Sequence, residues 1–215
     1  MYRPFEDFMP AARCVSVIGS GGKTALLRHL SEKLDGTVIL TTSTHIRPFP
    51  GVPLAASGEL DEVRSLLASH RVVCAGTPQS TGKLAAPEIP FEDLLSVADR
   101  VLIEADGAAG RPLKAHRPWE PVIPACTGLT VCVVGASGLG KPVSEACHCP
   151  ELFAELAGTT PDAPVNIEHV ARVLNRENLA DCCLINQIDV LPDPSVARRL
   201  CDLITVDAFA GSLRR

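Results

Sequence analysis

Short apolar runs alternate along the chain with stretches in which apolar side chains recur every three or four positions. The first pattern is typical of buried strands, and the second of helices that bury one face. The predicted strands cover residues 14–18, 37–40, 71–75, 100–106, 130–134 and 184–189, and the predicted helices follow Thr24 and cover 60–69, 91–98, 151–157, 167–174 and 195–203. This alternation predicts an α/β fold, a three-layer sandwich with a mainly parallel sheet of about six or seven strands.

A glycine-rich loop joins the first predicted strand to the first predicted helix. Its residues are Gly19, Ser20, Gly21, Gly22, Lys23 and Thr24. Strand, glycine loop, Lys-Thr and helix form a phosphate-binding arrangement, in which backbone N–H groups and the helix dipole face an anion. In that interpretation Lys23 reaches the β- and γ-phosphates and the Thr24 hydroxyl contacts Mg²⁺. Val17 stands where the full pattern has its first glycine, so a glycine-rich turn with a surface lysine is the alternative.

A run of polar residues follows the second predicted strand, with the sequence Thr-Thr-Ser-Thr-His at 41–45. Ligands bind outside the carboxyl ends of the strands in open parallel α/β sheets. We therefore expect Thr42, Thr44 and His45 to contact Mg²⁺, its waters or a γ-phosphate. The alternative is a hydroxyl-rich turn that satisfies its own backbone.

Two carboxylates, Glu104 and Asp106, end the apolar strand that begins at Arg100, and Gly107 follows them. Proteins with a phosphate loop keep the acid that holds Mg²⁺ at such a strand end. Two carboxylates at i and i+2 lie on one face of a strand and suit a hard cation. A pair of acids that make caps or salt bridges is the alternative.

The segment at 108–124 contains four prolines and is not expected to form a helix. It carries Arg111, Lys114, His116 and Arg117 just after the two carboxylates. These cations are candidates for clamping phosphates or an anionic second substrate. A solvated loop is the alternative.

An Asn-x-x-Asp pattern, Asn186 and Asp189, ends the last predicted strand. Side chains of these types at this spacing can contact a purine base, with the carboxylate accepting from the N–H groups of guanine. Gln187 stands where the usual guanine-reading pattern has lysine. The pattern therefore predicts base contact but leaves ATP and GTP both open.

Two other segments have motif-like features that we discount. Residues 137–142 contain glycines and a lysine, but a helix is not expected to begin cleanly at Pro142. Cys147 and Cys149 flank a histidine, which is too few ligands for a closed metal site.

Composition limits the class of protein. The 215 residues suit one domain over 1–215, with a loose lead-in at 1–12. The net charge of −5 argues against a surface that wraps nucleic acid. The chain has no apolar run long enough to span a membrane, and its nine cysteines include several in apolar runs. Residues 1–10 lack a basic region followed by an apolar one, so we expect no signal peptide. We expect a cytoplasmic protein with reduced, buried thiols.

The chain resembles the YqeC family, accessory proteins of selenium-dependent molybdenum hydroxylases. The blocks that carry the resemblance are residues 17–24, 41–46, 104–114 and 186–189. The Glu-Ala-Asp-Gly block with its trailing Arg-Pro-Leu-Lys is the most specific, because generic phosphate-loop proteins lack it. The resemblance implies a P-loop NTPase fold and a role in making or loading the selenium-containing molybdenum cofactor, with a molybdenum hydroxylase or its cofactor as partner.

Together these features predict a protein that binds Mg²⁺ with ATP or GTP, as an NTPase or a small-molecule phosphoryl-transfer or ligase-type enzyme. Lys23 would stabilise charge, Thr24 and Asp106 would hold Mg²⁺, and Glu104 would act as base or second metal contact. The alternative is a nucleotide-switched chaperone that delivers cofactor to a client hydroxylase without small-molecule chemistry.

Overall fold

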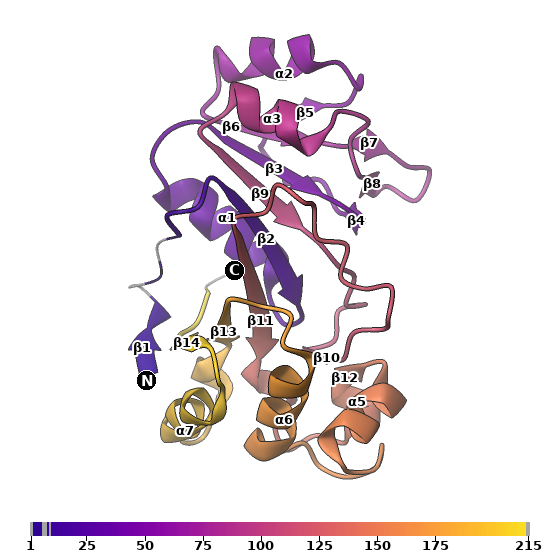
Figure 1. Ribbon diagram of the computed structural model, residues 1–215, viewed down its shortest axis with the longest axis vertical. Helices are drawn as coiled ribbons and strands as arrows, with labels where there is room; N and C mark the ends of the chain where they lie inside the picture. The colour runs from indigo at the N-terminus through magenta and orange to yellow at the C-terminus, as the bar shows by residue number, and fades with distance from the viewer. Residues whose placement is uncertain (1, 6–7, 9, 214–215) are drawn as a thin grey trace.

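A nine-stranded sheet organises the computed structural model, which describes residues 2–5, 8 and 10–213 (Figure 1). The strand order is β1-β14-β13-β11-β2-β9-β3-β6-β5, and every pairing in it is parallel. The bounds are β1 Tyr2–Pro4, β2 Cys14–Gly19, β3 Val38–Thr42, β5 Leu54–Ala55, β6 Val72–Ala75, β9 Arg100–Glu104, β11 Leu129–Gly135, β13 Cys182–Asn186 and β14 Asp207–Ala210.

Seven α-helices cover the two faces of this sheet in the described residues. They are α1 Lys23–Lys33, α2 Leu60–Leu67, α3 Phe91–Val97, α4 Val143–Ala146, α5 Pro150–Ala157, α6 Ile167–Glu177 and α7 Ser195–Leu203. Two small sheets complete the fold: β4 His45–Ile46 with β8 Leu84–Ala85 and β7 Thr77–Pro78, and β10 Leu113–Lys114 with β12 Cys147–His148. The structure is therefore the expected three-layer α/β arrangement with a mainly parallel sheet.

The side chains of β2 point alternately to the two faces of the sheet, which shows how the layers are packed. Val15 and Val17 point into a core with the buried face of α1, whereas Ile18 points into the opposite core with α4–α7. Cys14, on the same side as Ile18, contacts the core that α2 and α3 cover. Strands that are buried on both faces need apolar residues at nearly every position, so these strands are continuous apolar runs in the sequence.

Three features differ from the sequence predictions. The sheet has nine strands rather than about six or seven, because β1, β5 and β14 have only two to four residues and carry too little pattern to be recognised. The lead-in is not loose where it is described, since β1 pairs with β14 and Phe5 is buried. A helix does begin at Val143, with Pro142 as its N-cap, because proline needs no N–H partner there.

In the described residues, no helix has the length and apolar content needed to cross a bilayer.

Candidate functional site

The loop between β2 and α1 has a backbone that only glycine adopts easily. Gly21 and Gly22 have φ values of +85° and +137°. A Cβ on Gly21 would lie 2.4 Å from the Gly135 Cα, and one on Gly22 would lie 2.3 Å from Asn186 Nδ2. The glycines therefore permit close approach of the loop to β11 and β13.

Lys23 begins α1, and its ammonium is buried inside the loop. Its Nζ donates to the Gly19 carbonyl over 2.7 Å and lies 2.9 Å from Asp106 Oδ1. The second contact is an ion pair whose angles are not those of a hydrogen bond. Only 5% of the Lys23 side chain is exposed, which excludes the alternative of a solvated surface lysine.

Thr24 and Glu104 meet beside this ammonium. The exposed Thr24 donates its hydroxyl hydrogen to Glu104 Oε2 over 2.9 Å. Burial raises the pKa of Glu104 above its ordinary value, although Lys23 and the Thr24 hydrogen bond act in the opposite direction. No described residue hydrogen-bonds to the other carboxylate oxygen of Glu104. One hydroxyl and one partly free carboxylate are thus available to a cation that keeps several of its waters.

Asp106 is fully buried and is surrounded by donors. Its Oδ2 accepts from the Gly19 N–H over 2.9 Å and lies 3.3 Å from Lys114 Nζ. The same oxygen lies 2.8 Å from His116 Nε2. Burial alone would raise the pKa of Asp106, but the hydrogen bond from His116 and the charges of Lys23 and Lys114 hold it at about 2. Asp106 therefore fastens the loop to its surroundings, with its oxygens occupied by protein groups.

His116 and Glu177 extend this network to the C-terminal end of α6. His116 Nδ1 lies 2.8 Å from Glu177 Oε2, and the His116 backbone N–H donates to Glu177 Oε1 over 2.6 Å. Burial lowers the pKa of His116, but the hydrogen bonds to Asp106 and Glu177 outweigh it and raise the pKa to about 9. A carboxylate at a helix C-terminus opposes the helix dipole, so the charged imidazole compensates Glu177.

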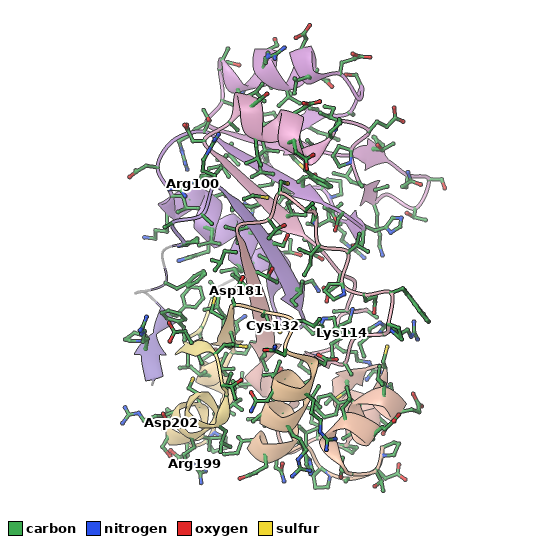
Figure 2. The ribbon with its side chains drawn as sticks, viewed as in Figure 1. Arg100, Lys114, Cys132, Asp181, Arg199 and Asp202 are labelled. Atoms are coloured by element: carbon green, nitrogen blue, oxygen red, sulfur yellow. The ribbon has the colours of Figure 1, made fainter. Side chains whose placement is uncertain are left out.

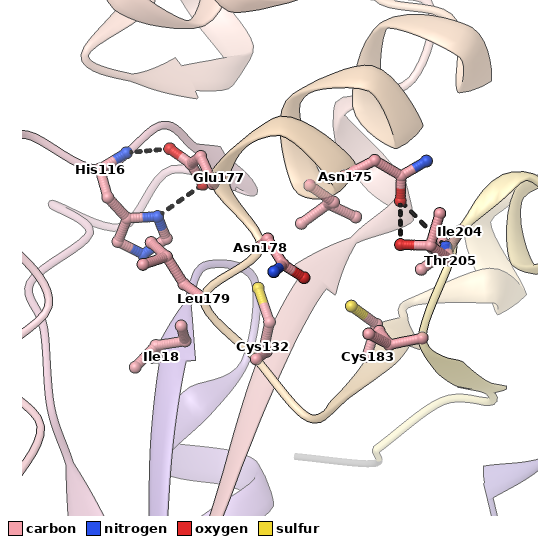
Figure 3. Close-up of a pocket in the computed structure, with 13 residues that line it drawn as sticks. Ile18, His116, Cys132, Asn175, Glu177, Asn178, Leu179, Cys183, Ile204 and Thr205 are labelled. Carbon is pink, nitrogen blue, oxygen red and sulfur yellow. Dashed lines mark hydrogen bonds and ion pairs between the residues drawn. The ribbon is translucent and has the colours of Figure 1, made fainter.

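The sequence predicts His116 only as one of the basic residues that could clamp phosphates, and it gives no indication of Glu177, because 61 positions separate the two. Figure 3 shows them beside a small cavity that Cys132 and Cys183 also line. The cavity volume is about 10 Å³, close to what one water molecule needs. It is too small for a substrate.

The two cations predicted for an acceptor site differ in exposure, because Lys114 is buried and Arg111 is exposed. The Lys114 ammonium is fully buried, donates to the Gly107 carbonyl over 2.5 Å and lies 3.1 Å from Glu120 Oε2 (Figure 2). Arg111 is exposed, but its guanidinium donates to the Glu145 carbonyl. Its own carbonyl accepts from the Ser20 hydroxyl, so the segment after Asp106 packs against the loop.

The polar run after β3 reaches the site mainly through Thr42. The Thr42 hydroxyl donates to the Glu104 carbonyl over 2.7 Å and accepts from the Thr44 N–H over 3.0 Å. Thr42 therefore satisfies backbone groups, as the turn interpretation expects. Thr44 is half-buried, with its hydroxyl 3.4 Å from that of Thr42, and His45 is exposed.

Asn186 and Asp189 border a groove on the other side of the loop. Asn186 Nδ2 donates to the Gly21 carbonyl over 2.8 Å, and its Oδ1 accepts from the Leu213 N–H over 2.8 Å. Asp189 is exposed and accepts from the Ser212 hydroxyl. The groove has a volume of about 940 Å³, and Gly22, Asn186, Gln187, Asp189 and Ser212 are among its lining residues. Its size suits a nucleoside-sized ligand.

The cysteines form no disulfide. All nine are free thiols, and eight of them are buried. Burial raises the pKa of the Cys147 thiol to about 12, so this side chain is protonated at neutral pH. Within the described ranges, no three His, Cys, Asp or Glu side chains gather as a set of metal ligands.

Comparison with known protein sequences identifies the family of this chain. The sequence model described as YqeC protein matches residues 15–151. The chain belongs to the YqeC family. An "Uncharacterized protein YqeC" from Escherichia coli (strain K12) is 33% identical over 179 residues, which are 74% of this chain and 66% of the relative. The chain thus spans slightly less than two thirds of that relative's length. No solved structure matches.

The YqeC match covers only part of the site. Residues 15–151 include the glycine loop, both carboxylates and His116. Glu177, Asn186 and Asp189 lie beyond it. The central part of the site is therefore within the segment that the YqeC family model describes.

Proposed function

We propose that the protein binds a nucleoside triphosphate with Mg²⁺ at residues 19–24 and hydrolyses or transfers its γ-phosphoryl group. The observation that carries the proposal is the pairing of a buried lysine with a hydroxyl–carboxylate pair at a glycine loop. Lys23 lies beside Asp106, and Thr24 contacts Glu104. An anion at the loop would provide the charge that this ammonium now finds in Asp106.

The donors of the site fit Mg²⁺. Thr24 and Glu104 supply oxygen ligands of the type that this cation prefers, and few protein ligands suit an ion that retains water. When bound, Mg²⁺ would neutralise negative charge on the β- and γ-phosphates. The raised pKa of Glu104 also suits a group that accepts a proton from a nucleophile. Asp106 is better suited to hold the loop and Lys23 than to bind metal directly, because protein groups surround both of its oxygens.

The groove beside Asn186 is the proposed base site. Asn186 holds the Gly21 carbonyl, so the groove and the phosphate loop are one continuous surface. Asp189 is exposed there and can accept from an amino group of a purine. ATP and GTP are both compatible with this arrangement.

Isothermal titration of Mg-ATP and Mg-GTP tests the proposal. Wild type should bind at least one of them, and Lys23→Met, which keeps the length of the side chain, should lose that binding. Lys33→Ala is the matched control, because this exposed lysine lies at the other end of the same helix. Circular dichroism of each variant separates lost binding from lost folding. Equal binding by Lys23→Met and wild type, or none by wild type, would overturn the proposal.

A nucleotide-switched chaperone is the second candidate, and one observation favours it. The contacts Lys23–Asp106–His116–Glu177 connect the loop to α6. Replacement of Asp106 by phosphate as the partner of Lys23 would alter this connection. Slow hydrolysis that a client accelerates supports the chaperone, whereas rapid turnover with a small acceptor supports the enzyme.

The cellular setting that we propose is maturation of the selenium-containing molybdenum cofactor of hydroxylases. Its support is membership of the YqeC family together with the resemblance to accessory proteins of those enzymes. Loss of the Lys23 side chain should then lower the cofactor content of a client hydroxylase in cells. A client that is fully loaded in such cells would contradict this setting without affecting nucleotide binding.

A further inference from the structure

The small sheet of β4, β8 and β7 stands directly after the polar run, at the carboxyl side of β3 (Figure 1). One of its faces is anchored in the core. Ile46 and Leu84 pair across the strands, are 3% and 1% exposed, and join the core that contains the buried face of α1. The sheet is therefore a fixed platform whose position is set by packing.

The other face of this platform is basic. Since side chains alternate along a strand, His45 and Arg47 share the face opposite to Ile46. His45 pairs with Ala85 and Ile46 with Leu84 in antiparallel register, and these two pairs make up the β4–β8 ladder. Arg47 follows this ladder on one strand and Lys83 precedes it on the other, so the two residues flank the same end of the ladder. A backbone hydrogen bond from the Gln79 N–H to the Lys83 carbonyl closes the neighbouring hairpin there.

These three side chains have no hydrogen-bond or ion-pair partner among the described residues. No hydrogen bond or ion pair involves the side chains of His45, Arg47 or Lys83, all three of which are exposed. Other arginines are held by carbonyls: Arg71 donates to those of Ser31 and Leu34, and Arg13 to that of Ala98. Arg47 and Lys83 thus differ from the arginines that stabilise the fold through hydrogen bonds to carbonyls.

The basic face lies near the proposed phosphate site. Thr44, which precedes His45, contacts Thr42, whose hydroxyl donates to the Glu104 carbonyl. The charge of Lys83 acts on the Glu104 carboxylate, although the two residues form no ion pair. The Lys83 ammonium is therefore within electrostatic reach of the Glu104 carboxylate.

We propose that His45, Arg47 and Lys83 bind an oxyanion, a phosphate or carboxylate group of a second substrate, beside the Glu104 side of the glycine loop. Arginine binds either anion with two parallel N–H donors, and lysine adds a point charge. The role as a second-substrate site rests on the proposed function, but the binding itself can be measured without nucleotide.

The test uses the full chain labelled with ¹⁵N and titrated separately with inorganic phosphate and with succinate at constant ionic strength. Backbone amide signals at 45–47 and 82–85 report the basic face, and those of Gly21 and Gly22 report the loop. We expect saturable shifts at the basic face with one or both probes. Arg47→Ala with Lys83→Ala should weaken this binding by about tenfold or more, since each charged hydrogen bond contributes about that much.

Lys33→Ala with Arg64→Ala is the control, because it removes the same charge from exposed positions elsewhere and should leave the affinity unchanged. Shifts that sodium chloride reproduces, or that the two double variants alter equally, would overturn the proposal. Shifts at Gly21 and Gly22 alone would also overturn it while supporting the loop as an anion site. Binding at the basic face in a protein that does not bind nucleotide would contradict only the proposed function.

Discussion

His116 Nε2 lies 2.8 Å from Asp106 Oδ2, and both side chains are almost fully buried. This contact joins the segment after β9 to a carboxylate that also accepts from the Gly19 N–H. Through Glu177 on its other side, His116 connects the glycine loop to α6. The charge state of one imidazole therefore affects both the stability of the fold and the shape of the loop.

Replacement of His116 by glutamine should lower the free energy of unfolding by about 3 kcal/mol at pH 7. The reason is that Asp106 and Glu177 would keep their burial but lose a charged donor. Urea denaturation measures the change. His70→Gln, at an exposed position, should change stability by less than about 0.5 kcal/mol. Similar losses in the two variants would show that the buried network does not stabilise the fold.

The pH dependence of stability should follow His116 on the alkaline side. Its pKa is raised from 6.5 to about 9 in the folded protein. The stabilisation is therefore complete below about pH 6.5 and is lost as the pH rises through 9, by up to about 3 kcal/mol. Urea denaturation at several pH values should show this fall in wild type and not in His116→Gln. A wild-type free energy that stays constant from pH 6 to 9.5 would contradict the prediction.

On the acid side, the same reasoning applies to Asp106 with opposite sign. Its pKa is lowered from 3.8 to about 2, so its contribution is present above pH 3.8 and is lost as the pH falls through 2.

Gly21→Ala should be far more damaging than Gly82→Ala, although both glycines have positive φ. A Cβ at Gly21 would lie 2.4 Å from backbone of Gly135, whereas one at Gly82 would meet nothing within 4 Å. We expect Gly82→Ala to cost about 1 kcal/mol from backbone strain alone, and Gly21→Ala several times more. Thermal unfolding of the two variants decides this. Equal costs would mean that the loop is not held against β11.

Thr24→Val should separate metal binding from phosphate binding. It keeps the shape of the side chain but removes the hydroxyl that donates to Glu104. Nucleotide affinity in the presence of EDTA should be unchanged, while the gain in affinity on adding Mg²⁺ should fall by about tenfold. If Mg²⁺ strengthens nucleotide binding equally in the variant and in wild type, the Thr24 hydroxyl does not contribute to metal binding.

Asn186→Ala and Asp189→Ala should have different effects, because one residue is buried and the other exposed. Asn186 bonds to both Gly21 and Leu213, so its loss should cost about 1–3 kcal/mol of stability. Asp189→Ala should leave stability nearly unchanged and weaken binding of the preferred nucleotide by about tenfold. Titration calorimetry and urea denaturation of both variants test this. A stability loss at Asp189 without loss of affinity would assign it a structural role.

Much of the fold was predictable because its signals are local. Six of the sheet strands and the principal helices follow from apolar runs and three-to-four-residue spacing, and the order strand, loop, helix identified the glycine loop. β1, β5 and β14 were missed because they have only two to four residues and their pairing depends on distant residues. The positions of Glu104 and Asp106 beside the loop followed from the rule that parallel strands present their carboxyl ends at one edge.

The sequence by itself determined the parallel α/β architecture and the residue types that meet at the carboxyl edge, since both depend on short-range pattern. Only the tertiary structure decided which of those residues contact one another and which are buried. It paired Thr24 with Glu104, enclosed Asp106 among donors, buried Lys114, and brought Glu177 to His116 across 61 positions. The physical reason is that burial and charge pairing depend on which segments lie next to one another, and spacing along the chain does not encode that proximity.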